Sequence, residues 1–273
     1  MPQLRGHEVF ALRRSGSGES DGINWISADL SEPLKPETLP EKIDAVIHLA
    51  QSPEYRNLPD GAPHVFRVNT ASTAELLEYA RKASAEHFLY ASTGSVYEPF
   101  TGSMLEDQLV SPKNFYPASK LAGEAVCRGY NDHFAVALAR IFFLYGPGQE
   151  QMLIARLVEG VLNGVPATLP EDGPGISLTP TYVDDCGRFF VEALAQKTDG
   201  IVNVAGPQPA TIEDIIRTVE SAAGKQAVIQ RSGKQPGLEM TPPADKFHAM
   251  CRKDSLVTLS EGIRRTVDAA RQA

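Results

Sequence analysis

Short apolar runs alternate with longer amphipathic segments through the first half of the chain. Continuous apolar runs of this length are typical of parallel strands that are covered on both faces, and apolar residues at helical spacing indicate the helices between them. We expect strands over residues 7–12, 24–28, 43–50, 87–93 and 134–144, and helices over residues 64–84 and 116–133. This alternation predicts an α/β fold built on a doubly wound parallel sheet.

The pattern changes after Tyr145-Gly146-Pro147. A helix over 149–163 leads into the Pro- and Gly-rich segment 165–180, which we interpret as an irregular loop. Asp184 or Asp185 suits the N-cap of a helix that runs to about residue 196, and we prefer this role to catalysis for the pair. A strand over 201–205, a helix start at 211–214 and a final helix over 259–271 follow.

Composition excludes several classes of protein. The 273 residues are 42% hydrophobic and carry a net charge of -8, which argues against binding to nucleic acid or to an anionic membrane. No apolar run is long enough to span a bilayer, and the first residues lack the pattern of a signal sequence. The three cysteines are far apart and without metal-ligand spacing. We expect a cytoplasmic protein with reduced thiols and no metal.

One group of residues suggests chemistry. Tyr116 and Lys120 are four residues apart, so on a helix they share a face, and a nearby ammonium would lower the pKa of the phenol. Thr93 ends an apolar run and would lie at the carboxyl end of a strand, where open parallel sheets bind ligands. The three side chains together indicate a site that oxidises a hydroxyl or reduces a carbonyl.

A strand that ends in Ser-Thr-x-x-Val-Tyr, followed by Tyr-x-x-x-Lys, resembles the extended short-chain dehydrogenase/reductases, the NAD-dependent epimerase/dehydratase family. Other family landmarks occur in order along the whole chain: His48-Leu49-Ala50, Asn69, Tyr145-Gly146-Pro147, Tyr182-Val183-Asp184-Asp185 and Asn203-Val204-Ala205-Gly206. The resemblance implies that Thr93, Tyr116 and Lys120 form the catalytic triad. It also implies a Rossmann-type dinucleotide-binding domain over 1–147, with 181–205 returning to it, and a substrate-binding region over 148–180 and 206–273.

The resemblance places further residues beside the cofactor. Asp29, with Leu30 next to it, resembles the adenine contact. The other implied cofactor residues are Leu49, Ala50, Gln51, Tyr116, Lys120 and Phe143. Arg13 and Arg14 follow a strand at the place where an acidic residue would bind a ribose hydroxyl, so they suit the 2'-phosphate of NADP, which we expect over NAD. Two solvated arginines at a strand end are the alternative.

The glycine fingerprint of the family is missing. Gly-x-x-Gly-x-x-Gly normally links the first strand to the first helix and lets the backbone approach the pyrophosphate. Residues 1–7 look like the tail of that helix, and residues 16–22 read as a turn, since another strand follows them. Loss of the central strand would leave two unpaired sheet edges and uncover apolar surface. Either the start codon was assigned too far downstream, which we favour, or this is a real but impaired product.

The residues near the triad also bear on the reaction. Gly94 and Ser95 stand where the family's dehydratases carry an Asp-Glu pair, which disfavours dehydration and leaves epimerisation or simple redox chemistry. Phe143 and Leu178 replace an Asn and an Arg that commonly meet a nucleotide diphosphate. These two replacements argue against a nucleotide-sugar substrate, so the expected substrate is left open between a sugar nucleotide and a related small molecule. A catalytically impaired binding or scaffold protein is the alternative, and the family also implies a homodimer through the 64–84 and 116–133 helices.

Overall fold

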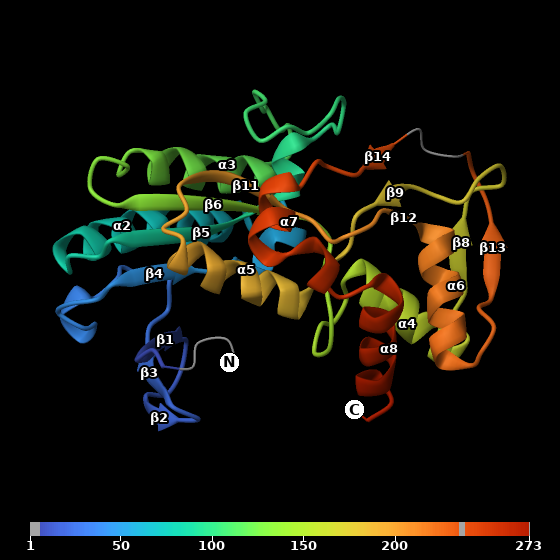
Figure 1. Cartoon of the computed structure of the whole chain (residues 1–273), viewed down its shortest axis with the longest axis horizontal. Coiled ribbons are helices and arrows are strands. Elements are labelled where there is room, and N and C mark those ends of the chain that lie inside the picture. Colours follow the sequence, from blue (N-terminus) through green and yellow to red (C-terminus); the bar gives the residue numbers. More distant parts are fainter. Residues whose placement is uncertain (1–5, 235–237, 273) are drawn as a thin grey trace. The chain divides into compact units, whose positions relative to one another are not determined.

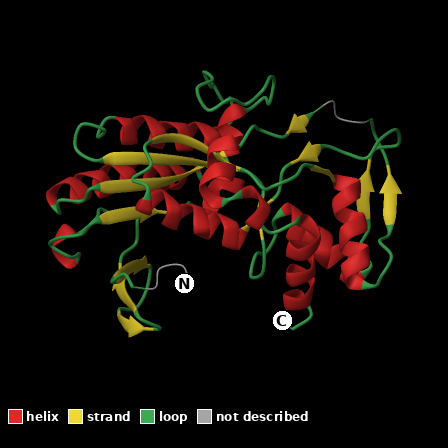
Figure 2. Cartoon of the chain, in the orientation of Figure 1, coloured by secondary structure: helices red, strands yellow, loops and turns green. Residues whose placement is uncertain are grey.

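The computed structural model describes residues 6–234 and 238–272, and in it helices and short strands alternate along the chain (Figures 1 and 2). Of the expected helix tail at residues 1–7, residues 1–5 lie outside the described part, and Gly6 and His7 are not helical. The chain forms two compact units. The first contains the described residues up to Pro99, Leu109–Arg140 and Phe190–Val202, and the second contains Phe100–Gln108, Ile141–Phe189 and the described residues from Asn203 onward.

A four-stranded sheet forms the centre of the first unit. Its strands, in spatial order, are β11 (Gly200–Val204), β6 (Ala135–Ile141), β5 (His87–Thr93) and β4 (Ala45–His48). β4 and β5 run parallel. Helices α2 (Ser72–Lys82) and α3 (Phe115–Arg128) contribute Leu77 and Cys127 to a core that also contains Tyr90 of β5 and Leu138 of β6. The expected α/β architecture with a parallel sheet is confirmed.

The predicted helix over 64–84 is not continuous. It consists of α1 (Ala62–Phe66), a π-helical segment Arg67–Ala71 and α2. Thr73 Oγ1 and Tyr90 Oη both donate to the carbonyl oxygen of Asn69, at 2.9 and 3.0 Å. In a regular α-helix this carbonyl would accept the backbone N–H of Thr73. Its use by two hydroxyls accounts for the local widening of the helix.

A smaller sheet precedes the large one in the chain. β1 (Val9–Arg13) runs parallel to β3 (Ile23–Ser27), and β2 (Gly18–Ser20) pairs antiparallel with the other edge of β3. The stretch 16–22 was predicted as a turn, but only Asp21 and Gly22 turn. Their φ angles of +56° and +72° suit a two-residue hairpin loop, in which both central residues need positive φ.

Both sheets have an edge strand without a partner on one side. Within the described residues β1 pairs only with β3, and β4 pairs only with β5. Phe10 of β1 is 40% exposed and Leu49, directly after β4, is 55% exposed. An exposed apolar side chain therefore lies at one edge of each of these two sheets.

The predicted strand over 134–144 is divided. β6 ends at Ile141, and a separate strand β7 (Leu144–Tyr145) pairs with β10 (Thr181–Tyr182). Phe143 has a φ of +41°, in the left-handed region that bulky residues rarely adopt, so the extended backbone cannot continue through it.

The second unit has its own apolar core. Helices α4 (Leu153–Asn163), α6 (Ile212–Ala223) and α8 (Leu259–Ala270) surround it. The interpretation of 165–180 as irregular loop was wrong: β8 (Ala167–Leu169) pairs with β13 (Ile229–Arg231), and β9 (Ser177–Leu178) lies between β12 (Ala210–Thr211) and β14 (Glu239–Met240). Their partners are distant in sequence, so the local pattern could not reveal them. The predicted helix start at 211–214 is confirmed by a capping box in α6.

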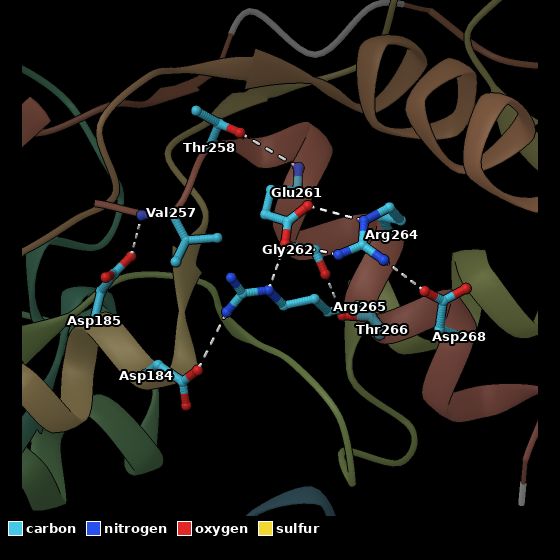
Figure 3. A network of polar contacts seen from close by, with 10 residues as sticks. All are labelled: Asp184, Asp185, Val257, Thr258, Glu261, Gly262, Arg264, Arg265, Thr266 and Asp268. Atoms are coloured by element: carbon cyan, nitrogen blue, oxygen red, sulfur yellow. Dashed lines mark hydrogen bonds and ion pairs between the residues drawn. The ribbon is translucent and has the colours of Figure 1, made fainter. Parts of the chain in front are cut away.

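The two acidic residues at the start of α5 (Val183–Ala195) hold the C-terminal segment rather than cap their own helix (Figure 3). Asp185 accepts the backbone N–H of Val257 at 2.8 Å. Val257 lies in the segment between α7 (Asp245–Cys251) and α8. Asp184 lies 3.6 Å from the guanidinium of Arg265 on α8. The capping role expected from the sequence is replaced by these tertiary contacts.

Candidate active site

Thr93 occupies the carboxyl end of β5. It is 9% exposed, and its Oγ1 accepts the backbone N–H of Ser95 at 3.2 Å. This bond caps the single 3-10 turn Gly94–Tyr97 that follows the strand. The hydroxyl is therefore held in place by the turn that it begins.

Tyr116 lies in the first turn of α3. Asn114, the N-cap residue before this helix, is extended, and its side-chain amide donates to the carboxylate of Glu98, which fixes the entry into the helix. The phenol of Tyr116 donates to Oε1 of Gln51 at 2.9 Å. Its ring centroid lies 5.1 Å from that of Tyr55. The loop after β4 thus brings an amide and an aromatic ring to the phenol.

Lys120, one helical turn later, is buried. Its Nζ donates to the carbonyl oxygens of Ala50 at 3.3 Å and Ala91 at 2.9 Å, and lies 5.0 Å from the ring centroid of Tyr90. Burial lowers the pKa of Lys120 to about 8. Lys120 therefore ties α3 to the carboxyl ends of both β4 and β5.

The electrostatic relation between these two residues differs from our expectation. Burial raises the pKa of Tyr116 to about 12, and a hydrogen bond with the Thr93 side chain only partly opposes this effect. Within the described residues, the Lys120 ammonium contacts two carbonyls and a ring face, not the phenol. The predicted lowering of the phenol's pKa by the ammonium was wrong for this structure, because the long lysine side chain reaches the strand ends instead.

A chain of hydrogen bonds behind Tyr116 was missed by the sequence reasoning. The backbone N–H of Ser52 donates to Asn69 Oδ1 at 3.0 Å, Asn69 Nδ2 donates to Ser119 Oγ at 3.0 Å, and Ser119 Oγ donates to the carbonyl of Tyr116 at 2.7 Å. Asn69 had been noted only as a family landmark. The chain connects the loop that carries Gln51 to the first turn of α3.

The basic residues expected at the cofactor are placed near the small sheet. Arg13 Nε donates to the carbonyl of Gly16 at 3.0 Å, and its guanidinium lies 4.9 Å from the ring centroid of Trp25. Arg13 is thus part of the hairpin itself.

Asp29 accepts the backbone N–H and the hydroxyl of Ser31 at 2.9 and 2.7 Å, and these bonds lower its pKa. Its carboxylate is ionised and already anchored.

Arg14, Leu30 and Phe143 are the remaining predicted cofactor residues. Arg14 is exposed after β1, and Leu30 packs against the core of the first unit. Phe143 belongs to the second unit and packs against its core. The structure brings together Thr93, Tyr116, Lys120, Ala50 and Gln51.

The described residues fit one end of a nicotinamide dinucleotide. Leu49 and Gln51 are exposed at the carboxyl end of β4, next to the Tyr116 phenol, and so offer an apolar side chain and an amide where open parallel sheets bind ligands. Within the described residues, no Gly-x-x-Gly-x-x-Gly segment links a strand to a helix as a pyrophosphate site of this kind requires.

The model of the NAD-dependent epimerase/dehydratase family matches residues 3–205 of the chain. This chain belongs to that family. An uncharacterized UDP-glucose epimerase of Bacillus subtilis is 30% identical over 248 residues, which cover 88% of this chain and 76% of the relative. A probable UDP-glucuronate 4-epimerase of Rhizobium meliloti is 26% identical, over 89% of this chain and 76% of the relative.

Solved structures agree with the assignment. UDP-glucuronic acid 4-epimerase from Bacillus cereus, in complex with UDP-glucuronic acid and NAD, is 31% identical with a TM-score of 0.80, covering 93% of this chain and 83% of that one. RMD from Pseudomonas aeruginosa, complexed with NADPH, is 22% identical with a TM-score of 0.76 and covers 91% of each chain, which shows a likeness of fold. The protein is an enzyme of the epimerase/dehydratase family. No helix in the described part is both long and apolar enough to cross a membrane.

Proposed function

We propose that this enzyme epimerises a hydroxyl-bearing carbon of a UDP-sugar through a transient ketone, with Tyr116 as the acid and base. The observation that carries the proposal is the convergence of Tyr116, Thr93 and Lys120 at the carboxyl ends of β4 and β5. The UDP-sugar specificity is supported by the relatives, among them the UDP-glucuronate 4-epimerases.

Each residue has a distinct role in this scheme. Tyr116 exchanges a proton between its Oη and the substrate oxygen, and Thr93 orients that oxygen. Lys120 holds α3 against the strand ends through two carbonyls. A bound oxidised nicotinamide cofactor would accept a hydride from the substrate carbon, return it to the other face, and add a positive charge that favours the phenolate. Gln51 accepts the hydrogen bond of the Tyr116 phenol, and the substrate oxygen would replace Gln51 as the partner of that phenol.

The absence of acidic side chains at Gly94 and Ser95 supports epimerisation over dehydration. Both positions lie in the turn capped by Thr93, so an acid there would be close to the reacting carbon. Without acidic side chains at these two positions, the elimination of water lacks a proton donor and a proton acceptor.

For the cofactor we propose NAD rather than the NADP expected from the sequence. The guanidinium of Arg13 already binds Gly16 and stacks on Trp25, so it is not poised to receive a 2'-phosphate. The B. cereus relative is in complex with NAD. Calorimetric titration with NAD and NADP distinguishes the two, and tighter binding of NADP would contradict this choice.

The proposed reaction is tested by incubating the protein with NAD and either UDP-glucose or UDP-glucuronic acid and following the C4 epimer by proton NMR. Tyr116→Phe should reduce turnover by roughly 10²- to 10⁴-fold, the usual contribution of general acid–base catalysis, and leave the affinity for NAD nearly unchanged. Absence of both turnover and NAD binding would reject the enzyme in favour of the binding or scaffold role.

We also propose a homodimer through the helices that carry Phe66 and Phe115. These rings are 51% and 41% exposed, which is unusual for large apolar side chains on neighbouring helices of one unit. Sedimentation equilibrium measures the mass. A monomer at micromolar concentration would contradict the proposal.

A further inference from the structure

A fully buried ion pair lies beneath the candidate active site. Glu124 of α3 is 0% exposed and Arg140 of β6 is 1% exposed. Arg140 Nε donates to Glu124 Oε1 at 3.0 Å, and Arg140 Nη2 donates to Oε2 at 2.8 Å. This is the two-pronged geometry in which a guanidinium holds a carboxylate in one orientation.

Two further side chains join the pair. Ser92 Oγ donates to Glu124 Oε1 at 2.5 Å. The guanidinium of Arg140 lies 4.8 Å from the ring centroid of Tyr97 and also hydrogen bonds to its side chain. Burial works to lower the pKa of Arg140, but its contacts with Glu124 and Tyr97 raise the pKa on balance, so the guanidinium stays charged.

The four residues connect the elements that carry the candidate catalytic side chains. Ser92 immediately precedes Thr93 on β5, and Tyr97 ends the turn that Thr93 caps. Glu124 is one helical turn beyond Lys120 on α3. The strand end, the turn and the helix thus meet at one carboxylate and one guanidinium.

Stability alone does not account for such a pair. Transfer of two charges out of water costs about as much as their attraction returns, and well-packed apolar replacements of buried pairs are often neutral or stabilising. What the pair offers instead is a single geometry. Proton transfer needs the reacting groups to be placed within a fraction of an ångström, which rigid supporting contacts provide.

We propose that Glu124 and Arg140 are positioning residues that keep the Thr93 hydroxyl and the Tyr116 phenol in register for catalysis. The proposal rests on the proposed function of the site. Neither residue reaches the substrate itself, because the side chains of Glu124 on α3 and Arg140 on β6 are both fully buried.

The test replaces the pair by apolar residues of similar size, Glu124→Leu with Arg140→Met. We expect the melting temperature to stay within a few degrees of the wild type, kcat to fall at least tenfold, and KM for the UDP-sugar to change less than threefold. The matched control is Arg128→Met, which removes a 46% exposed arginine 3.7 Å from the same carboxylate and should change neither constant. A folded double variant with wild-type kcat would overturn the proposal.

Ser92→Ala is the second variant, in case the double variant fails to fold. It removes one hydroxyl next to Thr93 and leaves the ion pair intact, so kcat should fall severalfold at constant KM. An unchanged kcat for Ser92→Ala would count against the network.

A readout independent of turnover separates this proposal from the proposed reaction. With 13C-labelled tyrosine, the resonance of Tyr116, assigned with Tyr116→Phe, should be sharp in the wild type and shifted or broadened in the double variant. If the wild type shows no turnover but the resonance responds in this way, the positioning role stands and the proposed reaction fails. An identical Tyr116 resonance in both proteins would reject the positioning role.

Discussion

Lys120 carries its charge in a place that water hardly reaches. It is 2% exposed, and within the described residues no carboxylate lies within ion-pair distance of it. Its contacts are two backbone carbonyls and the face of Tyr90. The protein therefore bears an electrostatic cost at this position, and Lys120→Met should reveal it.

The size and sign of the effect follow from the pKa. The value falls from 10.5 in the unfolded chain to about 8 in the fold, which corresponds to about 3 kcal/mol, as an order of magnitude. Below pH 8 both states bind the proton and the full cost is present. Between pH 8 and 10.5 the unfolded state binds more protons than the folded state, so the stability of the wild type rises with pH. Above 10.5 the cost is gone.

The free energy of unfolding of both proteins, measured with urea between pH 7 and 10.5, checks this reasoning. The stability of Lys120→Met relative to the wild type should decline by about 3 kcal/mol over this window. The difference in free energy of unfolding at any one pH also depends on the two carbonyls that lose a hydrogen-bond donor. The change of this difference with pH does not depend on them. Tyr116, with a pKa of about 12, stays protonated throughout.

Lys113→Met is the matched control, because Lys113 is exposed and precedes the same helix. The stability of this variant relative to the wild type should be independent of pH. A difference between Lys120→Met and the wild type that stays constant from pH 7 to 10.5 would show that the amine is solvated, and would refute the buried placement of this side chain.

Three other outcomes follow from the packing. Gly123→Ala should lower the free energy of unfolding by about 2 kcal/mol or more in a urea titration, because a Cβ at this position would clash with the hydroxyl of the buried Tyr90. A loss below about 0.5 kcal/mol would contradict this close approach. Thr211→Ala should cost about 1 kcal/mol by removing the N-cap of α6, and an unchanged melting temperature would count against the cap. Burial raises the pKa of the Cys127 and Cys186 thiols to about 12, so iodoacetamide at pH 8 should label them only after unfolding, as mass spectrometry would show.

The order of elements was predictable because the patterns that define them are local. The run that ends at Thr93 is buried at all seven positions of β5, and the helix with Tyr116 begins one residue earlier than expected. The short strands of the second unit could not be found this way. β9 has two residues, and what makes it a strand is pairing with β12 and β14, which lie far away in the sequence.

The structure brings Thr93, Tyr116 and Lys120 together, but the electrostatics of these side chains differ from those expected from the sequence. Spacing of four residues puts Tyr116 and Lys120 on one helix face, yet it cannot say where a flexible four-carbon chain directs its ammonium. That depends on Ala50 and Ala91, whose carbonyls accept from Lys120. Glu124 could not be recognised as a functional candidate, because its partner Arg140 lies on a different element, β6, and only the fold brings the two side chains together.

The proposed proton-transfer residues and the predicted adenosine contact rest on different sheets. Either group of residues can therefore be altered without the other. Thr93 and Tyr116 depend on β5, α3 and the buried pair of Glu124 with Arg140, all within the four-stranded sheet and its covering helices. Asp29 depends on the small β1–β3–β2 sheet and its own turn. The proposed proton-transfer residues therefore rest on the large sheet, whereas the predicted adenosine contact Asp29 rests on the small one. Changes in the small sheet should then affect the concentration of cofactor needed, and leave the arrangement of the phenol and the hydroxyl intact.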